Sequence, residues 1–125
     1  MEQTLVQLTL TRADLAQFTG SSQWFRHPLN QQVVFTEGAR HLAEAGGAYW
    51  LLDEIALAQR HIPAVAAEPF QAWQLSVLAN RSAKLTCGDG NRHTVFSKTV
   101  PYTDFPLVSV DLYFTDNTIL LPSEY

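Results

Sequence analysis

Residues 47–62 read Gly-Ala-Tyr-Trp-Leu-Leu-Asp-Glu-Ile-Ala-Leu-Ala-Gln-Arg-His-Ile and give the clearest helix signal in the chain. Glycine favours helix ends, so Gly46-Gly47 separates this stretch from any helix before it. Pro63 ends the helix, because the residue before a proline avoids the helical region. At 100° per residue about half of the helix is apolar, and we expect that half to face the core. It carries Ala48, Tyr49, Leu51, Leu52, Ile55, Ala56, Ala58 and Ile62.

The opposite half of this helix holds charged residues, but also Trp50 and Leu57. A helix face that meets only solvent does not usually carry a tryptophan and a leucine. Two explanations stay open. Either a second element of the chain covers this pair, or the pair belongs to an interface with a second copy of the protein, because aromatic residues ringed by polar groups are typical of interface cores.

The chain after Pro69 alternates apolar and polar residues with a period of two, which is typical of strands that bury one face. Turn residues separate the strands. Gly88-Asp-Gly-Asn91 predicts a tight hairpin turn, and Asn80-Arg81 and Asp116-Asn117 predict two more. The segments expected to form strands are residues 73–77, 83–87, 92–96, 107–114 and 118–121.

The first third of the chain predicts shorter elements. Residues 4–10 alternate as a short strand or an extended arm. Residues 11–18 predict a short helix that opens with a capping box between Thr11 and Asp14. Residues 23–35 predict a hairpin around Pro28-Leu29-Asn30. Thr36 is a good N-cap for a helix over residues 37–45.

Helices followed by a run of strands predict an α+β fold. We expect an antiparallel sheet of about four to five strands, packed on one face by the helix pair of residues 36–62. The chain has 125 residues and shows no linker or repeat, so we expect one domain over residues 1–125.

The charge pattern bears on the class of partner. Eight basic and twelve acidic residues give a net charge of −4, with no basic cluster, which argues against nucleic-acid binding. No apolar run approaches the roughly 20 residues that span a membrane. The first residues do not resemble a signal peptide, so a cytoplasmic protein is the simplest expectation.

Side chains that often carry chemistry do not form a known motif here. The four histidines, His27, His41, His61 and His93, have no metal-ligand spacing, and Cys87 is the only cysteine. Its place in the alternation turns Cys87 inward, as a buried structural residue rather than a nucleophile. We therefore expect no metal, no cofactor and no catalytic residues, and lean against an enzyme.

Two stretches are unusual enough to be candidate binding residues. Trp24, Arg26 and His27 place aromatic and cationic groups close together, and could line a pocket for a planar or anionic ligand. Pro101 to Pro106 predicts a rigid loop in which Asp104 makes an Asx turn, Phe105 anchors the loop and Tyr102 is available for function. In the alternative explanation for both, the aromatic residues belong to the core and the loop only connects strands.

Five stretches carry a further signal, and together they span nearly the whole chain: residues 18–20, 23–27, 47–53, 102–106 and 120–125. They resemble a family of small uncharacterised bacterial proteins that often accompany plasmids, phages or other mobile DNA. The resemblance implies an accessory cytoplasmic protein, a cargo gene of a mobile element, and supplies no activity and no catalytic residues.

The function expected from these patterns is a non-enzymatic interaction module. It would self-associate, as a homodimer through Trp50 and Leu57, and bind a protein partner. The alternative is a small-ligand-binding protein, or an enzyme of unfamiliar type, with a pocket between the helices and the sheet. That pocket would be lined by Trp24, Arg26, His27, Tyr102 and Asp104.

Overall fold

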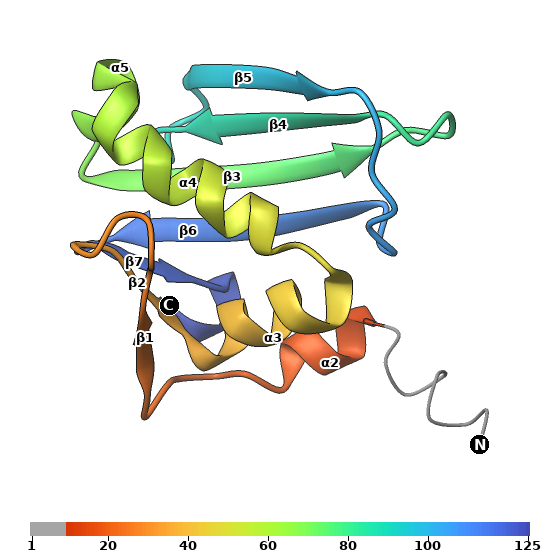
Figure 1. Ribbon diagram of the computed structural model, residues 1–125, viewed down its shortest axis with the longest axis horizontal. Helices are drawn as coiled ribbons and strands as arrows, with labels where there is room; N and C mark the ends of the chain where they lie inside the picture. Colours follow the sequence, from red (N-terminus) through yellow and green to blue (C-terminus); the bar gives the residue numbers. More distant parts are fainter. Residues whose placement is uncertain (1–9) are drawn as a thin grey trace.

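The computed structural model describes residues 10–125, and the segment predicted over residues 4–10 lies almost entirely outside that range. In the described residues, seven strands form one sheet in the order β1-β2-β7-β6-β3-β4-β5 (Figure 1). The strands are β1 (Trp24–Arg26), β2 (Val34–Thr36), β3 (Phe70–Val77), β4 (Ala83–Gly88), β5 (Thr94–Val100), β6 (Ser109–Thr115) and β7 (Thr118–Leu120). The helices are α2 (Arg12–Ala16), α3 (Glu37–Gly46), α4 (Tyr49–His61) and α5 (Pro63–Ala66), followed by a 3-10 turn, η1 (Pro122–Glu124).

The α+β class is confirmed. The expected antiparallel sheet of four to five strands is only partly right, because the sheet has seven strands and one pair, β2 with β7, is parallel. β1 and β2 form the predicted hairpin and then join the main sheet. They join it because β2 lies parallel to β7, with Phe35 opposite Ile119. β3, β4, β5 and β6 are antiparallel neighbours, as the alternation predicted. The sheet is therefore mixed.

The predicted helix pair covers one face of this sheet (Figure 1). The Thr36 hydroxyl accepts a hydrogen bond from the Ala39 N–H at 3.2 Å, which confirms the predicted N-cap of α3. Gly47 has a φ of 61°, a left-handed conformation that glycine adopts easily, and it ends α3. α4 then crosses the sheet, and the side chains that it buries are Leu51, Leu52, Ile55, Ala56 and Ala58.

The two faces of the sheet differ in burial, because the helices cover only one of them. On the face beneath the helices, Trp73 and Leu75 of β3 and Leu85 and Cys87 of β4 are buried in one apolar cluster. On the other face, the Gln74 side chain is exposed to solvent. In the part of the chain that the structure describes, no helix has the length and apolar character needed to cross a membrane.

The segment after β7 returns to the start of α3. One Glu124 carboxylate oxygen accepts hydrogen bonds from the Thr36 hydroxyl at 2.6 Å and from the Leu121 N–H at 2.9 Å. The other accepts from the Gly38 N–H at 3.1 Å. A carboxylate is favourable here, because the first N–H groups of a helix lack partners within the helix and carry partial positive charge. η1 is thereby fixed on α3.

Candidate binding sites at the two ends of the sheet

The first predicted group, in and after β1, is divided between solvent and core. Trp24 is 56% exposed and Arg26 is exposed, at one edge of the sheet. His27 is only 1% exposed. These three neighbours therefore do not present their side chains to one ligand surface.

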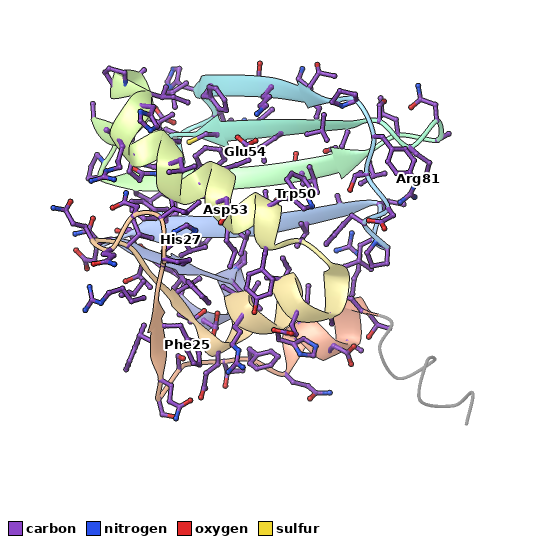
Figure 2. The ribbon with its side chains drawn as sticks, viewed as in Figure 1. Phe25, His27, Trp50, Asp53, Glu54 and Arg81 are labelled. Atoms are coloured by element: carbon purple, nitrogen blue, oxygen red, sulfur yellow. The ribbon has the colours of Figure 1, made fainter. Side chains whose placement is uncertain are left out.

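His27 instead holds the β1–β2 loop against α4 (Figure 2). Its Nδ1 accepts hydrogen bonds from the N–H groups of Leu29 at 3.1 Å and Asn30 at 3.2 Å. Because Nδ1 is an acceptor, the ring proton lies on Nε2, which donates to Asp53 Oδ1 at 2.8 Å. The Asn30 side chain adds a bond to the carbonyl of Ala56 in α4. The polar face of α4 is thus partly used to fix a loop.

The second predicted group lies far from the first in the sheet. Tyr102 and Asp104 are both exposed in the loop that leaves β5, the edge strand opposite β1. The structure does not bring Trp24 and Arg26 together with Tyr102 and Asp104. Ligand binding at either group stays a prediction, but a pocket shared by all five residues is not present.

The loop with Tyr102 is held by Arg81, in the turn between β3 and β4. Arg81 has a φ of 69°, and its guanidinium donates to the carbonyls of Thr103 at 3.0 Å and Phe105 at 2.8 Å. The Arg81 carbonyl in turn accepts from the Thr103 N–H at 2.8 Å. Hydrogen bonds from a charged donor are stronger than neutral ones. One side chain therefore fixes most of the loop.

The predicted Asx turn at Asp104 is wrong, because the Thr103 hydroxyl accepts from the Phe105 N–H at 3.1 Å. The predicted anchor is confirmed, since Phe105 is fully buried. Its ring lies so close to Gly46 that a Cβ there would be 2.7 Å from a ring carbon. Phe105 thus ties the loop to the end of α3.

Three large apolar side chains are exposed at this end of the sheet. Leu78 is 56% exposed, Tyr102 is 68% exposed and Val108 is 72% exposed. Leu78 follows β3, and the Val108 carbonyl accepts from the N–H of Val77, the residue before Leu78. We call Leu78, Arg81 and residues 101–108 the loop platform. Figure 2 shows Arg81 at the opposite end of the sheet from His27.

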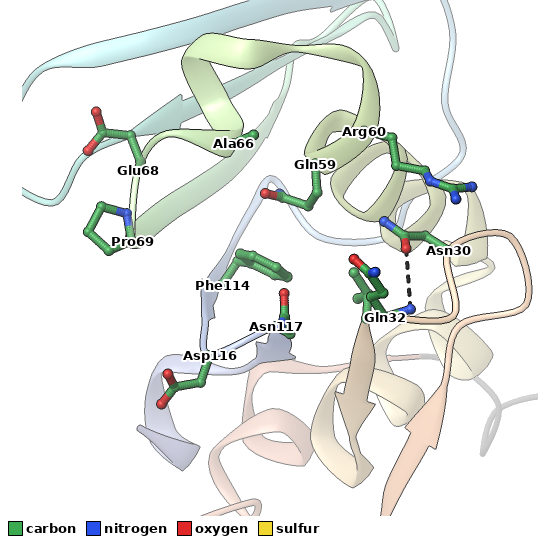
Figure 3. Close-up of a pocket in the computed structure, with 11 residues that line it drawn as sticks. Asn30, Gln32, Gln59, Arg60, Ala66, Glu68, Pro69, Phe114, Asp116 and Asn117 are labelled. Atoms are coloured by element: carbon green, nitrogen blue, oxygen red, sulfur yellow. Dashed lines mark hydrogen bonds between the residues drawn. The ribbon is translucent and has the colours of Figure 1, made fainter.

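The other end of the sheet contains a pocket of about 340 Å³, drawn in Figure 3. Its walls come from the β1–β2 loop, the end of α4, the end of α5 with the segment after it, and the β6–β7 turn, and the Phe114 ring lies inside. We call it the amide pocket, because four carboxamides line it together with charged groups. Its polar lining includes Gln32, Gln59, Arg60, Glu68, Asp116 and Asn117.

A buried amide network supports the wall of this pocket. Gln71 is fully buried and exchanges two hydrogen bonds with the Gln59 carboxamide, at 2.8 and 2.9 Å. Gln71 also accepts from the Trp73 indole N–H at 2.9 Å and donates to the Val65 carbonyl at 2.8 Å. Buried polar groups are stable only when they have such partners. The network fixes Gln59 at the pocket wall.

The charged groups of the amide pocket are separated from one another. Figure 3 places Glu68 and Asp116 on one side of the opening and Arg60 on the other. Among residues 10–125, none of the three side chains belongs to an ion pair. Arg60 makes a long 3.5 Å contact with the Leu29 carbonyl. A positive and a negative group therefore stand on opposite rims of the same small volume, with their charged ends directed outward to solvent (Figure 3).

The predicted interface residues lie on the α4 face nearest to β5. Glu54 lies between Trp50 and Leu57 on this face and binds the Lys98 ammonium of β5 at 2.6 Å. Trp50 is half-buried and packs against the core, so a second element of the chain covers part of it. Leu57 is also half-buried. Their use in an interface stays a prediction.

Cys87 is buried in the core. Burial raises the pKa of its thiol to about 12, with the nearby Glu68 carboxylate acting in the same direction. A thiol with a raised pKa is a poor nucleophile. In the described residues, no three His, Cys, Asp or Glu side chains are grouped closely enough to hold a metal ion.

Two residues that support these candidate sites were not predicted from the sequence, for different reasons. The sequence around Arg81 predicts only a turn, and no local pattern indicates its distant carbonyl partners. Gln71 did leave a signal, because its position alternates in phase with Trp73 and Leu75, which places a polar residue on the buried face. Such a residue needs hydrogen-bond partners, and hence marks a buried network.

Comparison with known proteins identifies a family but no function. No curated protein and no solved structure matches the chain significantly. One family model, described as a family of unknown function (DUF6876), matches residues 9–125. The protein therefore belongs to the DUF6876 family.

Proposed function

We propose that this protein is a non-enzymatic interaction module that self-associates through the loop platform. One observation carries the proposal: Leu78, in the turn after β3, and Tyr102 and Val108, in the loop that Arg81 and Phe105 hold, are each more than half exposed. Exposed apolar patches on a soluble protein commonly mark interaction sites, and tyrosine is enriched among the residues that contribute most to binding.

The rigidity of the loop platform favours binding. A flexible loop loses conformational entropy when a partner orders it, and this loss weakens association. Here Arg81 and the buried Phe105 hold the loop before any partner arrives. Tyr102 is therefore presented in a defined position, at little further entropic cost.

A second copy of the chain is the partner that fits this surface best. The Arg81 guanidinium is directed at the carbonyls of Thr103 and Phe105, and Asp104 is the exposed acidic residue of the platform. The apolar side chains Leu78, Tyr102 and Val108 can contact their own copies across a twofold axis. The net charge of −4 opposes close approach of two copies. A small, weak dimer with micromolar affinity is the expected result.

Sedimentation velocity of the full chain over a concentration series tests this proposal. We expect a monomer–dimer equilibrium that Tyr102→Ser or Val108→Ser weakens at least tenfold. Tyr125→Ser is the matched control, because Tyr125 is equally exposed but lies beside Phe70 and Tyr113, away from the platform. Its dimer should be unchanged.

The same experiment separates the loop platform from the α4 surface. A monomer at all concentrations, or a dimer that Tyr102→Ser leaves intact, would contradict self-association through the platform. If Trp50→Ala alone weakened the dimer, the interface would instead lie on α4 beside Trp50 and Leu57. Circular dichroism of each variant shows whether a loss of dimer reflects unfolding.

A further inference from the structure

We infer that the amide pocket binds a small zwitterion, an amino acid or dipeptide with a free ammonium group and a free carboxylate. This inference is independent of self-association, because the pocket and the loop platform lie at opposite ends of the sheet. It rests on the volume of the pocket, on its neutral lining and on the separation of its charges.

The volume sets the size of the ligand. Small-molecule sites usually enclose roughly 300–1,000 Å³, and the amide pocket, with about 340 Å³, is at the lower end of this range. It therefore suits an amino acid or a dipeptide and is too small for a long peptide.

The opposed charges set the chemical class. Arg60 can pair with a ligand carboxylate through its planar guanidinium, which matches carboxylate geometry. Glu68 and Asp116 on the opposite side can accept hydrogen bonds from an ammonium group (Figure 3). A nucleotide would bring its phosphates close to these two carboxylates, and like charges repel. A ligand with charges of both signs satisfies both sides.

The neutral lining suits the peptide group or polar side chain between those charges. Gln32 and Asn117 are exposed at the pocket, and each carboxamide offers one acceptor and two donor hydrogens. A peptide group carries one donor and one acceptor, which is the complement of a carboxamide. Gln59 is already fixed by Gln71, so this wall of the pocket is formed before binding.

Isothermal titration calorimetry of the full chain tests the inference, with glutamine, alanyl-glutamine and alanyl-phenylalanine as probes. We expect saturable binding of at least one probe with free ends. Amidating its carboxylate or acetylating its amino group should each weaken binding at least tenfold. Binding of the blocked forms with equal affinity, or binding of no probe to the folded protein, would overturn the inference.

A pair of changes places the ligand carboxylate. Arg60→Ala should weaken binding of the free-ended probe at least tenfold but leave binding of its amidated form unaffected. The substitution and the amidation each remove the same contact between Arg60 and the ligand carboxylate. Arg40→Ala is the matched control, since Arg40 is exposed on α3 and lies over the Phe25 ring. An Arg60→Ala effect that is equally large on the amidated probe would contradict this placement.

Discussion

The two ends of the sheet are stabilised by opposite kinds of polar chemistry. At the loop platform, the charged Arg81 side chain donates to two carbonyls of a surface loop and leaves apolar groups exposed. At the amide pocket, Gln71 is buried in a neutral network and polar groups line a cavity. A charged donor near the surface can exchange its partners for water, whereas a buried carboxamide cannot. The platform end is therefore expected to tolerate loss of its polar support better than the pocket end.

The largest effect is expected for Phe105→Ala, at the platform end. It removes a fully buried ring beside Gly46, and such truncations destabilise proteins by about 3–5 kcal/mol. Urea unfolding followed by tryptophan fluorescence measures the loss. Tyr102→Ala, three positions earlier in the same loop, should change stability by less than about 0.5 kcal/mol. Equal losses in the two variants would show that the loop has no buried anchor.

Gln71→Leu should cause the next largest loss of stability. It removes the buried hydrogen bonds at the pocket end while nearly preserving side-chain volume. The Trp73 indole N–H, the Gln59 carboxamide and the Val65 carbonyl each lose a partner. Leaving buried polar groups unpaired costs about 1–3 kcal/mol each, and we expect a total of about 3 kcal/mol after relaxation.

The matched control for that change is Gln74→Leu, on the same strand. The Gln74 side chain is exposed on the opposite face of the sheet, where it contacts Asp111. Its replacement should change stability by less than about 0.5 kcal/mol. If Gln71→Leu proved as mild as Gln74→Leu, the buried amide network would not stabilise the pocket end.

Arg81→Ala should lower the free energy of unfolding by only about 1–2 kcal/mol, because water can bind the carbonyls that lose the guanidinium. The free energy of dimerisation should fall by more than the free energy of unfolding, because the variant releases the surface loop and leaves the core packed. Arg81→Lys should not restore it, because lysine lacks the planar fork that reaches Thr103 and Phe105 together. Sedimentation velocity beside urea unfolding measures both. Full dimerisation of Arg81→Ala would contradict the proposed rigid platform.

At Cys87 the expected effect is a change in labelling rate rather than a loss of stability at neutral pH, and this rate reports on which end of the sheet has opened. Its raised pKa predicts negligible reaction with a disulfide reagent at pH 8 in the folded protein. Glu68 of the amide pocket contributes to that raised pKa. Gln71→Leu should therefore accelerate labelling, whereas Arg81→Ala should not. Labelling rates that rise equally in both variants would indicate general unfolding rather than a local opening.

The same thiol makes stability depend on alkaline pH. Above about pH 9 the unfolded chain loses the Cys87 proton, while the folded protein keeps it until about pH 12. The unfolded state then binds fewer protons, so stability falls with rising pH, by at most about 1.4 kcal/mol per unit. Cys87→Ala should be less sensitive to pH over this interval, and an unchanged slope would contradict the assignment.

Elements with a strong local pattern were predictable from the sequence. Residues 73–77 and 83–87 alternate long enough to identify strands and their buried face, and Thr36 supplies a visible N-cap. β1, β2 and β7 each have three residues, too few for a period, and the parallel β2–β7 pairing depends on tertiary contact.

The candidate sites were less predictable, because their partners are distant in the chain. The prolines on either side predict a loop anchored by Phe105, which its burial confirms, whereas a binding role for Tyr102 stays a prediction. The carbonyls that Arg81 binds, and the Asp53 carboxylate that His27 binds, cannot be paired from spacing. The amide pocket gathers residues from both halves of the chain, so no local motif marks it.

The contact between Glu124 and Thr36 has a consequence for the order in which the chain assembles. The two residues are 88 positions apart, and β2 joins the sheet only through β7, which directly precedes η1. During synthesis, the β1–β2 hairpin and the start of α3 must therefore wait for most of the remaining chain. The meander of β3, β4 and β5 makes mainly local contacts and can form early. We expect the N-terminal third to fold last, although the ribosome makes it first.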